Sequence, residues 1–195
     1  KGRGPRDDAE TAAIASGFCK NTTLREIVLV NWEETSCISV LTALRDHPML
    51  EILQVEGFSS FTGMDALLRG RKCQLKELNI EDFDDSNEEE MVGFESFMLE
   101  MGRNATILKM DIAGGVPLSR ANSQQLNAML RRNTVLQDLD LTGNALGSAG
   151  FAEVASALYR NTSILRLDVS NNGLDDLASA NMLRELLCQN KTITE

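Results

Sequence analysis

One apolar phrase recurs seven times along this chain, and this recurrence limits the possible folds more than any other feature. The phrase has apolar residues at its first, fourth and sixth positions, as in Leu136, Leu139 and Leu141. The copies lie 26, 25, 32, 29, 28 and 29 residues apart and begin at Leu24, Leu50, Leu75, Ile107, Leu136, Ile164 and Ile193. A repeat of this period indicates stacked supersecondary units instead of one globular core.

Each repeat divides into a strand phrase and a helix phrase. Residues 136–141 form a short strand phrase, whereas Phe151, Val154 and Leu158 fall on one face of a helix. Because strands joined through a crossover helix pair in parallel, we predict a curved stack with concave strands and convex helices. Asn161 follows the helix phrase, and we interpret it as a helix stop because asparagine tolerates the left-handed conformation.

The last two full repeats resemble the leucine-rich-repeat family. Residues 136–150 and 164–174 follow its pattern of leucines, with Asn144 and Asn172 at the ninth position. The repeat length and the helical second half are similar to the ribonuclease-inhibitor-like subclass. The resemblance implies an α/β fold: a right-handed solenoid shaped as a horseshoe arc, with about six full repeats and partial ones at both ends.

The first three repeats depart from this pattern at the ninth position. Trp32, Phe58 and Phe83 stand where the family has asparagine, and Gly115 occupies the fourth copy. In the family, that asparagine bonds neighbouring loops in a ladder, which aromatic side chains cannot do. We interpret the three aromatics as a buried apolar spine; a cluster that faces a partner is the alternative.

The repeats predict a single solenoid domain over 8–195, preceded by a flexible N-terminal segment at 1–7. Residues 8–20 read as the helical half of a unit without its strand, and 192–195 open a strand without its helix. Solenoids need polar terminal caps, and neither end of this sequence shows one. We therefore interpret the chain as part of a longer array.

The net charge of −10 comes almost entirely from one stretch. Residues 81–100 contain nine acids and no Lys or Arg, which leaves 20 acids against 19 bases elsewhere. Without a basic surplus, binding to nucleic acid is disfavoured, and no apolar run approaches the ~20 residues of a membrane span. The acidic loop 81–90 lies in the longest repeat spacing, so it is either a docking element for a basic partner or a solvated loop.

The sequence predicts neither an enzyme nor a cofactor-dependent protein. His47 is the only histidine, no nucleophile accompanies it, and no phosphate-binding glycine loop or C-x-x-C pair is present. We therefore expect no catalytic, cofactor or metal site. Buried or half-buried thiols in a reducing compartment, the cytoplasm, are expected for Cys19, Cys37, Cys73 and Cys188. Repeat-turn chemistry, and not glycosylation, accounts for the sequons at Asn21, Asn104, Asn161 and Asn190.

The concave strand positions and the acidic loop are the predicted partner-binding site. Asp111, Asp140 and Asp168 should form a row of like charge, offset by the alternating charges of their neighbours on the same strands. The alternative is that aspartate is simply usual at this position of the repeat. The predicted partner-binding residues are Val28, Val30, Gln54, Glu56, Glu77, Asn79, Glu81, Asp82, Asp84, Asp85, Lys109, Asp111, Asp138, Asp140, Arg166 and Asp168.

These residues favour a scaffold that binds a protein partner with a basic surface, and they leave its oligomeric state open. The family resemblance implies two alternatives, a regulator of a small GTPase and a cytoskeletal protein similar to the actin-capping tropomodulins. A sensor array within a larger receptor, as in NOD-like receptors, is a further possibility.

Overall fold

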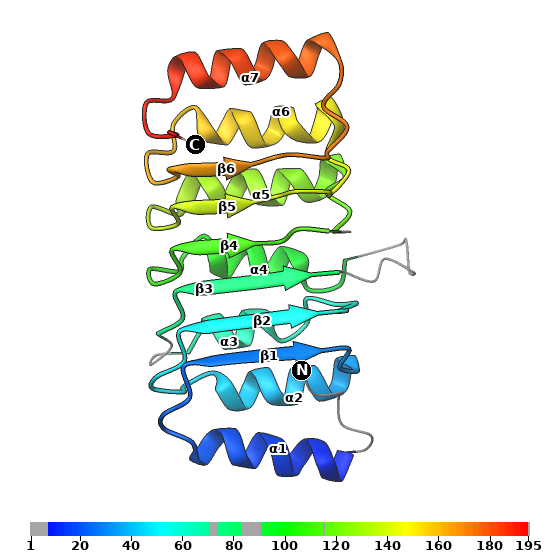
Figure 1. Ribbon diagram of the computed structural model, residues 1–195, viewed down its shortest axis with the longest axis vertical. Helices are drawn as coiled ribbons and strands as arrows, with labels where there is room; N and C mark the ends of the chain where they lie inside the picture. Colours follow the sequence, from blue (N-terminus) through cyan, green and yellow to red (C-terminus); the bar gives the residue numbers. More distant parts are fainter. Residues whose placement is uncertain (1–7, 71–73, 83–90, 115, 195) are drawn as a thin grey trace.

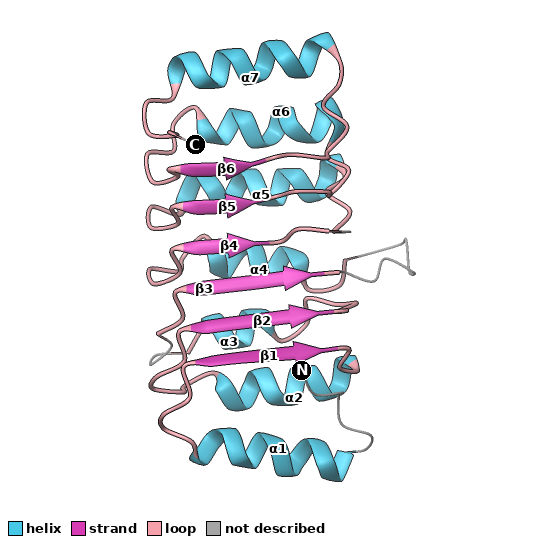
Figure 2. Ribbon diagram, viewed as in Figure 1, coloured by secondary structure: helices cyan, strands magenta, loops and turns pink. Residues whose placement is uncertain are grey.

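The computed structural model describes residues 8–70, 74–82, 91–114 and 116–194, and the predicted N-terminal segment 1–7 lies outside them. A single parallel sheet contains the strands in chain order, each joined to the next through a helix (Figures 1 and 2). The strands are β1 (Glu26–Val30), β2 (Ile52–Glu56), β3 (Glu77–Glu81), β4 (Lys109–Asp111), β5 (Asp138–Asp140) and β6 (Arg166–Asp168). The helices are α1 (Asp8–Lys20), α2 (Glu34–Leu44), α3 (Met64–Leu68), α4 (Phe94–Met101), α5 (Arg120–Arg132), α6 (Gly147–Leu158) and α7 (Leu177–Gln189).

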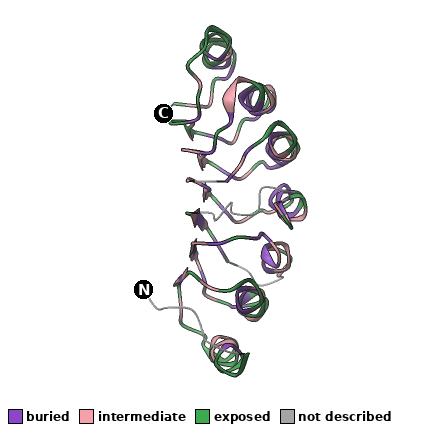
Figure 3. Cartoon of the chain, turned by 90° about the vertical axis from the view of Figure 1, so that its right-hand side faces the viewer, coloured by how far each residue is buried: buried purple, intermediate pink, exposed green. Residues whose placement is uncertain are grey.

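All described helices cover one face of the sheet, and the other face is left open. Figure 3 shows the two layers following a shallow bend, with the strands on its inner side. The parallel strands and the helix layer predicted from the sequence are therefore confirmed.

The apolar phrase fills the space between the two layers. Leu136, Leu139 and Leu141 are fully buried, and the residues between them point to the open face. The strands pair in register, so Met110 of β4 lies beside Leu139 of β5. Each repeat thus adds one row of apolar side chains to a continuous core.

Asn144 and Asn172 form the predicted ladder where the strands end. The Asn144 side chain accepts a hydrogen bond from Val116 N at 3.0 Å and donates to Ile112 O at 2.6 Å, one repeat earlier. Asn172 repeats the arrangement, accepting from Asn144 N and donating to Leu141 O. Both side chains are buried, so the ladder satisfies backbone groups that water does not reach.

A second ladder of asparagines follows the helices, and here the predicted mechanism was wrong. Asn133 and Asn190 end their helices with φ near −70° and ψ near 130°, which is extended backbone and not the left-handed conformation. Their side chains cap the turn instead. Asn161 accepts from Ser163 N and Ile164 N and donates to Leu130 O in the preceding repeat. Because the Asn161 and Asn190 amides are buried and bonded, the folded chain cannot carry glycans there.

The aromatic core differs from the predicted spine. Phe61 lies at its centre, with ring centroids 5.7 Å from Phe58, 5.0 Å from Phe94 and 5.3 Å from Phe97. Only Phe58 comes from a ninth position; the others belong to the helix phrases around α3 and α4. Trp32 is half-buried against the core, while Phe83 and Gly115 lie outside the described residues.

Asp176 caps the last helix, and its effect on stability should depend on pH. Its carboxylate accepts from Ser148 Oγ at 2.6 Å and from Ser179 N at 2.7 Å, and these bonds lower the pKa of Asp176 to about 2. A lowered pKa stabilises the fold above the unfolded value of about 4, and this stabilisation is lost as pH falls towards 2. Asp176→Ala should therefore unfold at a lower temperature than wild type at pH 7, with the difference shrinking below pH 4.

The neighbouring exposed Asp175 provides the matched control, because substituting it leaves the cap intact. Thermal unfolding over a pH series measures both variants. If Asp176→Ala and Asp175→Ala were equally stable at pH 7, the cap would contribute nothing.

Candidate protein-binding face

The open side of the sheet, here named the strand face, consists of the third, fifth and seventh residues of each phrase. Their side chains point away from the helices, as predicted. The third-position column is Glu26, Ile52, Glu77, Lys109, Asp138 and Arg166. The fifth-position column is Val28, Gln54, Asn79, Asp111, Asp140 and Asp168. The seventh-position column over the first three strands is Val30, Glu56 and Glu81.

The strand face is acidic along most of its length. The only cations in these columns are Lys109 and Arg166, and the carboxylates are Glu26, Glu56, Glu77, Glu81, Asp111, Asp138, Asp140 and Asp168. Towards β1 the strand face becomes apolar, because its columns there contain Val28, Val30 and Ile52. All three side chains are half-buried and so remain partly accessible. The helices contribute no residue to these columns, so charge on this face is not needed to pack the core.

The three aspartates of the fifth-position column each have a structural task. One oxygen of each carboxylate accepts a hydrogen bond from the backbone N–H two residues later, at distances of 2.8 to 3.0 Å. This bond turns the chain as it leaves the strand, which gives a physical reason for aspartate at this position. Burial raises the pKa of Asp111, whereas hydrogen bonds from the Ser170 hydroxyl and backbone lower the pKa of Asp168.

The column beside the aspartate row alternates in charge, as the sequence suggested, because Lys109, Asp138 and Arg166 are register neighbours. The Lys109 ammonium lies 2.8 Å from Glu77, and Arg166 lies 3.6 Å from Asp138. The hydrogen bond with Lys109 lowers the pKa of Glu77 and raises that of Lys109. Both pairs lie within the third-position column, so the closest ion pairs do not involve the aspartate row.

Asn79 is the exception to the expected exposure of the fifth-position column. It is only 9% exposed, and its Nδ2 donates to Glu77 Oε1 at 3.1 Å. The other atom of its amide, Oδ1, is buried without a hydrogen-bond partner. Buried side-chain oxygens that lack a hydrogen-bond donor are uncommon in folded proteins.

The acidic loop is described only at its beginning. Glu81 accepts a hydrogen bond from Gln54 Nε2 at 3.3 Å, and the same amide donates to Glu56 at 3.0 Å. Asp82 follows β3 with a left-handed φ of 51°. Asp84 and Asp85 lie outside the described residues, as do the other loop residues from 83 to 90.

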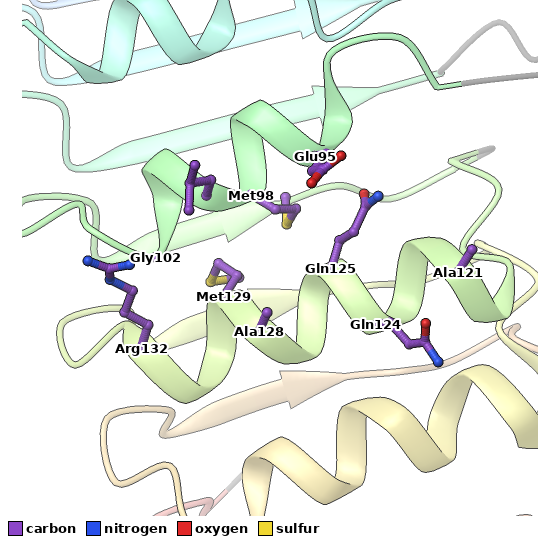
Figure 4. Close-up of a pocket in the computed structure, with 10 residues that line it drawn as sticks. Glu95, Met98, Gly102, Ala121, Gln124, Gln125, Ala128, Met129 and Arg132 are labelled. Atoms are coloured by element: carbon purple, nitrogen blue, oxygen red, sulfur yellow. The ribbon is translucent and has the colours of Figure 1, made fainter.

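A groove of about 460 Å³ lies between α4 and α5 in the helix layer, and the sequence reasoning missed it (Figure 4). Met98 and Met129 lie in it, and Leu99 is 45% exposed beside it. The two helices that line it differ in length, since α4 has eight residues and α5 has 13. One feature of the sequence could have indicated this groove. Gly102 follows a short apolar helix phrase, and small side chains of α5 line the groove with it.

Two of the isolated reactive residues, His47 and Cys37, are buried. His47 is buried in a turn, where its Nδ1 accepts from Met49 N at 3.3 Å. Burial raises the pKa of the Cys37 thiol to about 12. Contrary to expectation, Cys19 and Cys188 are exposed; Cys73 lies outside the described residues. Within the described ranges there is neither a cluster of three metal-ligating side chains nor a helix long and apolar enough to cross a membrane.

Comparison with solved structures supports the fold. The chain is similar to a structure of leiomodin-1 actin-binding site 2, with a TM-score of 0.53 and 13% identity over 95% of this chain and 90% of that one. A tropomodulin C-terminal domain from Caenorhabditis elegans aligns at 14% identity over 92% of both chains, with a TM-score of 0.49. No protein-family model and no curated protein matches the sequence. At these identities the likeness concerns the fold alone: the chain has a leucine-rich-repeat-like fold, as leiomodin-1 actin-binding site 2 does.

Proposed function

We propose that this chain is a leucine-rich-repeat solenoid of the ribonuclease-inhibitor-like subclass that binds a protein partner with a basic surface through its strand face. One observation carries the proposal: eight carboxylates and two cations occupy the in-register columns of an uncovered sheet. Such a surface attracts a partner of opposite charge and sets its orientation. The function is binding and not catalysis.

The aspartate row supports this proposal because its structural task uses only part of each side chain. The backbone bonds of the Asp140 and Asp168 turns use only Oδ1, so these bonds do not require the second oxygen of either carboxylate. The two carboxylates lie in the same column on β5 and β6, about 4.8 Å apart at the backbone. A basic segment lying across the strands would therefore meet a regular series of acceptors. The unpaired thiols of Cys19, Cys37 and Cys188 fit a reducing compartment, and we propose the cytoplasm.

A charge-neutralising double variant tests the proposal without removing the turns. Asn at positions 140 and 168 keeps an Oδ1 acceptor for each backbone bond but removes two negative charges. Asp140→Asn/Asp168→Asn should weaken the binding of an arginine- and lysine-rich peptide about tenfold at low salt, equivalent to about 1.4 kcal/mol. Fluorescence anisotropy at two ionic strengths provides the measurement, and higher salt should reduce the difference.

The matched control is Asp175→Asn/Glu185→Gln, which changes the net charge equally. Both residues are exposed and lie outside the strand-face columns, near and on α7. The control should bind the peptide as wild type does. Equal loss in both double variants would mean that net charge alone drives binding, and no loss in either would remove the strand face from the function.

A cytoskeletal role is the second candidate, favoured by the fold likeness to leiomodin-1 actin-binding site 2. That structure is of an actin-binding site, as its name says, and it aligns over nearly the whole of this chain. Sedimentation with filamentous actin and a pointed-end elongation assay test it directly. Absence of the chain from the actin pellet, together with unaltered elongation, would exclude this candidate and leave the first one standing.

A further inference from the structure

The amide of Asn79 is held in one orientation by its neighbours on the strand face. Lys109 on β4 forms an ion pair with Glu77, and Glu77 accepts the hydrogen bond from Asn79 Nδ2. Turning the amide over would bring its oxygen against the Glu77 carboxylate, where two acceptors repel each other. The orphaned atom is therefore the oxygen, and the ion pair fixes this arrangement.

An unsatisfied buried acceptor is costly to the free protein. Leaving such a group without a donor destabilises the free protein, and the same group strengthens binding when a ligand supplies the donor. Asn79 lies in the third of six strands, with Asp111 beside it in the same column. Asp111 Oδ1 already accepts from Ala113 N, so its other oxygen remains available to a second donor.

Two acceptors on adjacent strands, one neutral and one charged, match a planar donor with a positive charge. A guanidinium directs N–H groups from separate nitrogens in fixed directions, whereas an ammonium is a compact point charge. Gln54, on the other side of Asn79, already donates to Glu56 and Glu81 and so directs its hydrogens away. The acceptor pair is therefore Asn79 with Asp111.

We propose that Asn79 Oδ1 and Asp111 form a subsite on the strand face for one arginine side chain of the partner. This subsite rests on the proposed function, because it places a specific contact within the basic-partner surface. Asn79 Oδ1 is covered in the free chain, so docking requires a neighbouring side chain to move. Lys109 has 39% of its side chain exposed and is long enough to move away from Glu77. The guanidinium then takes the position that the ammonium leaves.

The test compares peptides of equal length and charge containing only arginine or only lysine as the basic residue. Wild type should bind the arginine peptide about five- to tenfold more tightly. Asn79→Leu, which removes the acceptor at similar volume, should abolish this preference while leaving the affinity for the lysine peptide unchanged. Asn79→Asp, which keeps an acceptor, should retain the preference. An unchanged preference in Asn79→Leu would overturn the subsite, and circular dichroism confirms that each variant is folded.

A small-molecule titration keeps the subsite separate from the proposed function. Methylguanidinium should shift the Asn79 side-chain amide and the Ala113 backbone amide saturably in nuclear magnetic resonance spectra, and methylammonium should shift them much less. Failure of both peptides to bind would reject the basic-partner proposal. Equal responses to the two small cations, or no response to either, would reject the arginine subsite whatever the peptides do.

Discussion

Replacing Asn144 with alanine is expected to lower the free energy of unfolding by about 4 kcal/mol, because several buried backbone groups lose their partners together. Its amide donates to Ile112 O and Leu141 O, and its oxygen accepts from Val116 N. Asn144 is 1% exposed, so water cannot replace these bonds. Each orphaned group costs about 1 to 3 kcal/mol, and relaxation of the loops keeps the total below the simple sum.

Urea unfolding followed by circular dichroism measures this loss as a lower midpoint with little change in slope. Asn181→Ala is the matched control, since Asn181 is exposed on α7 and alanine favours a helix. The control should be as stable as wild type or slightly more stable. Equal midpoints for Asn144→Ala and the control would show that the ladder does not stabilise the fold.

Truncating Phe61 to alanine should cost about 3 to 5 kcal/mol, the range found when a buried phenylalanine is removed. Phe61 is fully buried and meets Phe58 and Phe94 edge-on and Phe97 in a stacked arrangement. Its removal leaves a cavity between α3 and α4. The backbone there has little freedom to collapse, because a Cβ on Gly93 would already lie 2.7 Å from the Phe61 carbonyl carbon.

Phe61→Leu separates the loss of volume from the loss of ring contacts. Leucine keeps most of the apolar volume but removes the aromatic pairs, so about 1 to 2 kcal/mol is expected. Chemical denaturation of both variants gives the comparison. A loss below 1 kcal/mol in Phe61→Ala would mean that the aromatic cluster is dispensable.

The strand layer could be predicted because it depends on local periodicity. The spacing of Leu136, Leu139 and Leu141 determines which side chains face the helices, and every strand repeats it in register. Asn144 and Asn172 were also predictable, since the ladder needs only the same residue at the same position of successive repeats. Whether the strand face binds a partner stays a prediction.

Features that depend on contacts between different repeats could not be read from the sequence. Phe61 meets Phe94 and Phe97 across the boundary between two units of unequal length. Asn79 is buried and donates to Glu77, which pairs with Lys109 of the next repeat, and no repeat position encodes these contacts. The groove beside Leu99 lies between α4 and α5, which belong to successive repeats.

The two asparagine ladders make the molecule unevenly stiff along its length. From β5 onward, side-chain amides fasten each repeat to the one before it at both ends of the strands, as Asn144 and Asn161 do. Towards β1, aromatic and half-buried apolar side chains such as Trp32 take the ladder's ninth position, and these contacts slide more easily than hydrogen bonds. We therefore expect the C-terminal half to be the stiffer one, with bending to fit a partner concentrated in the first three repeats.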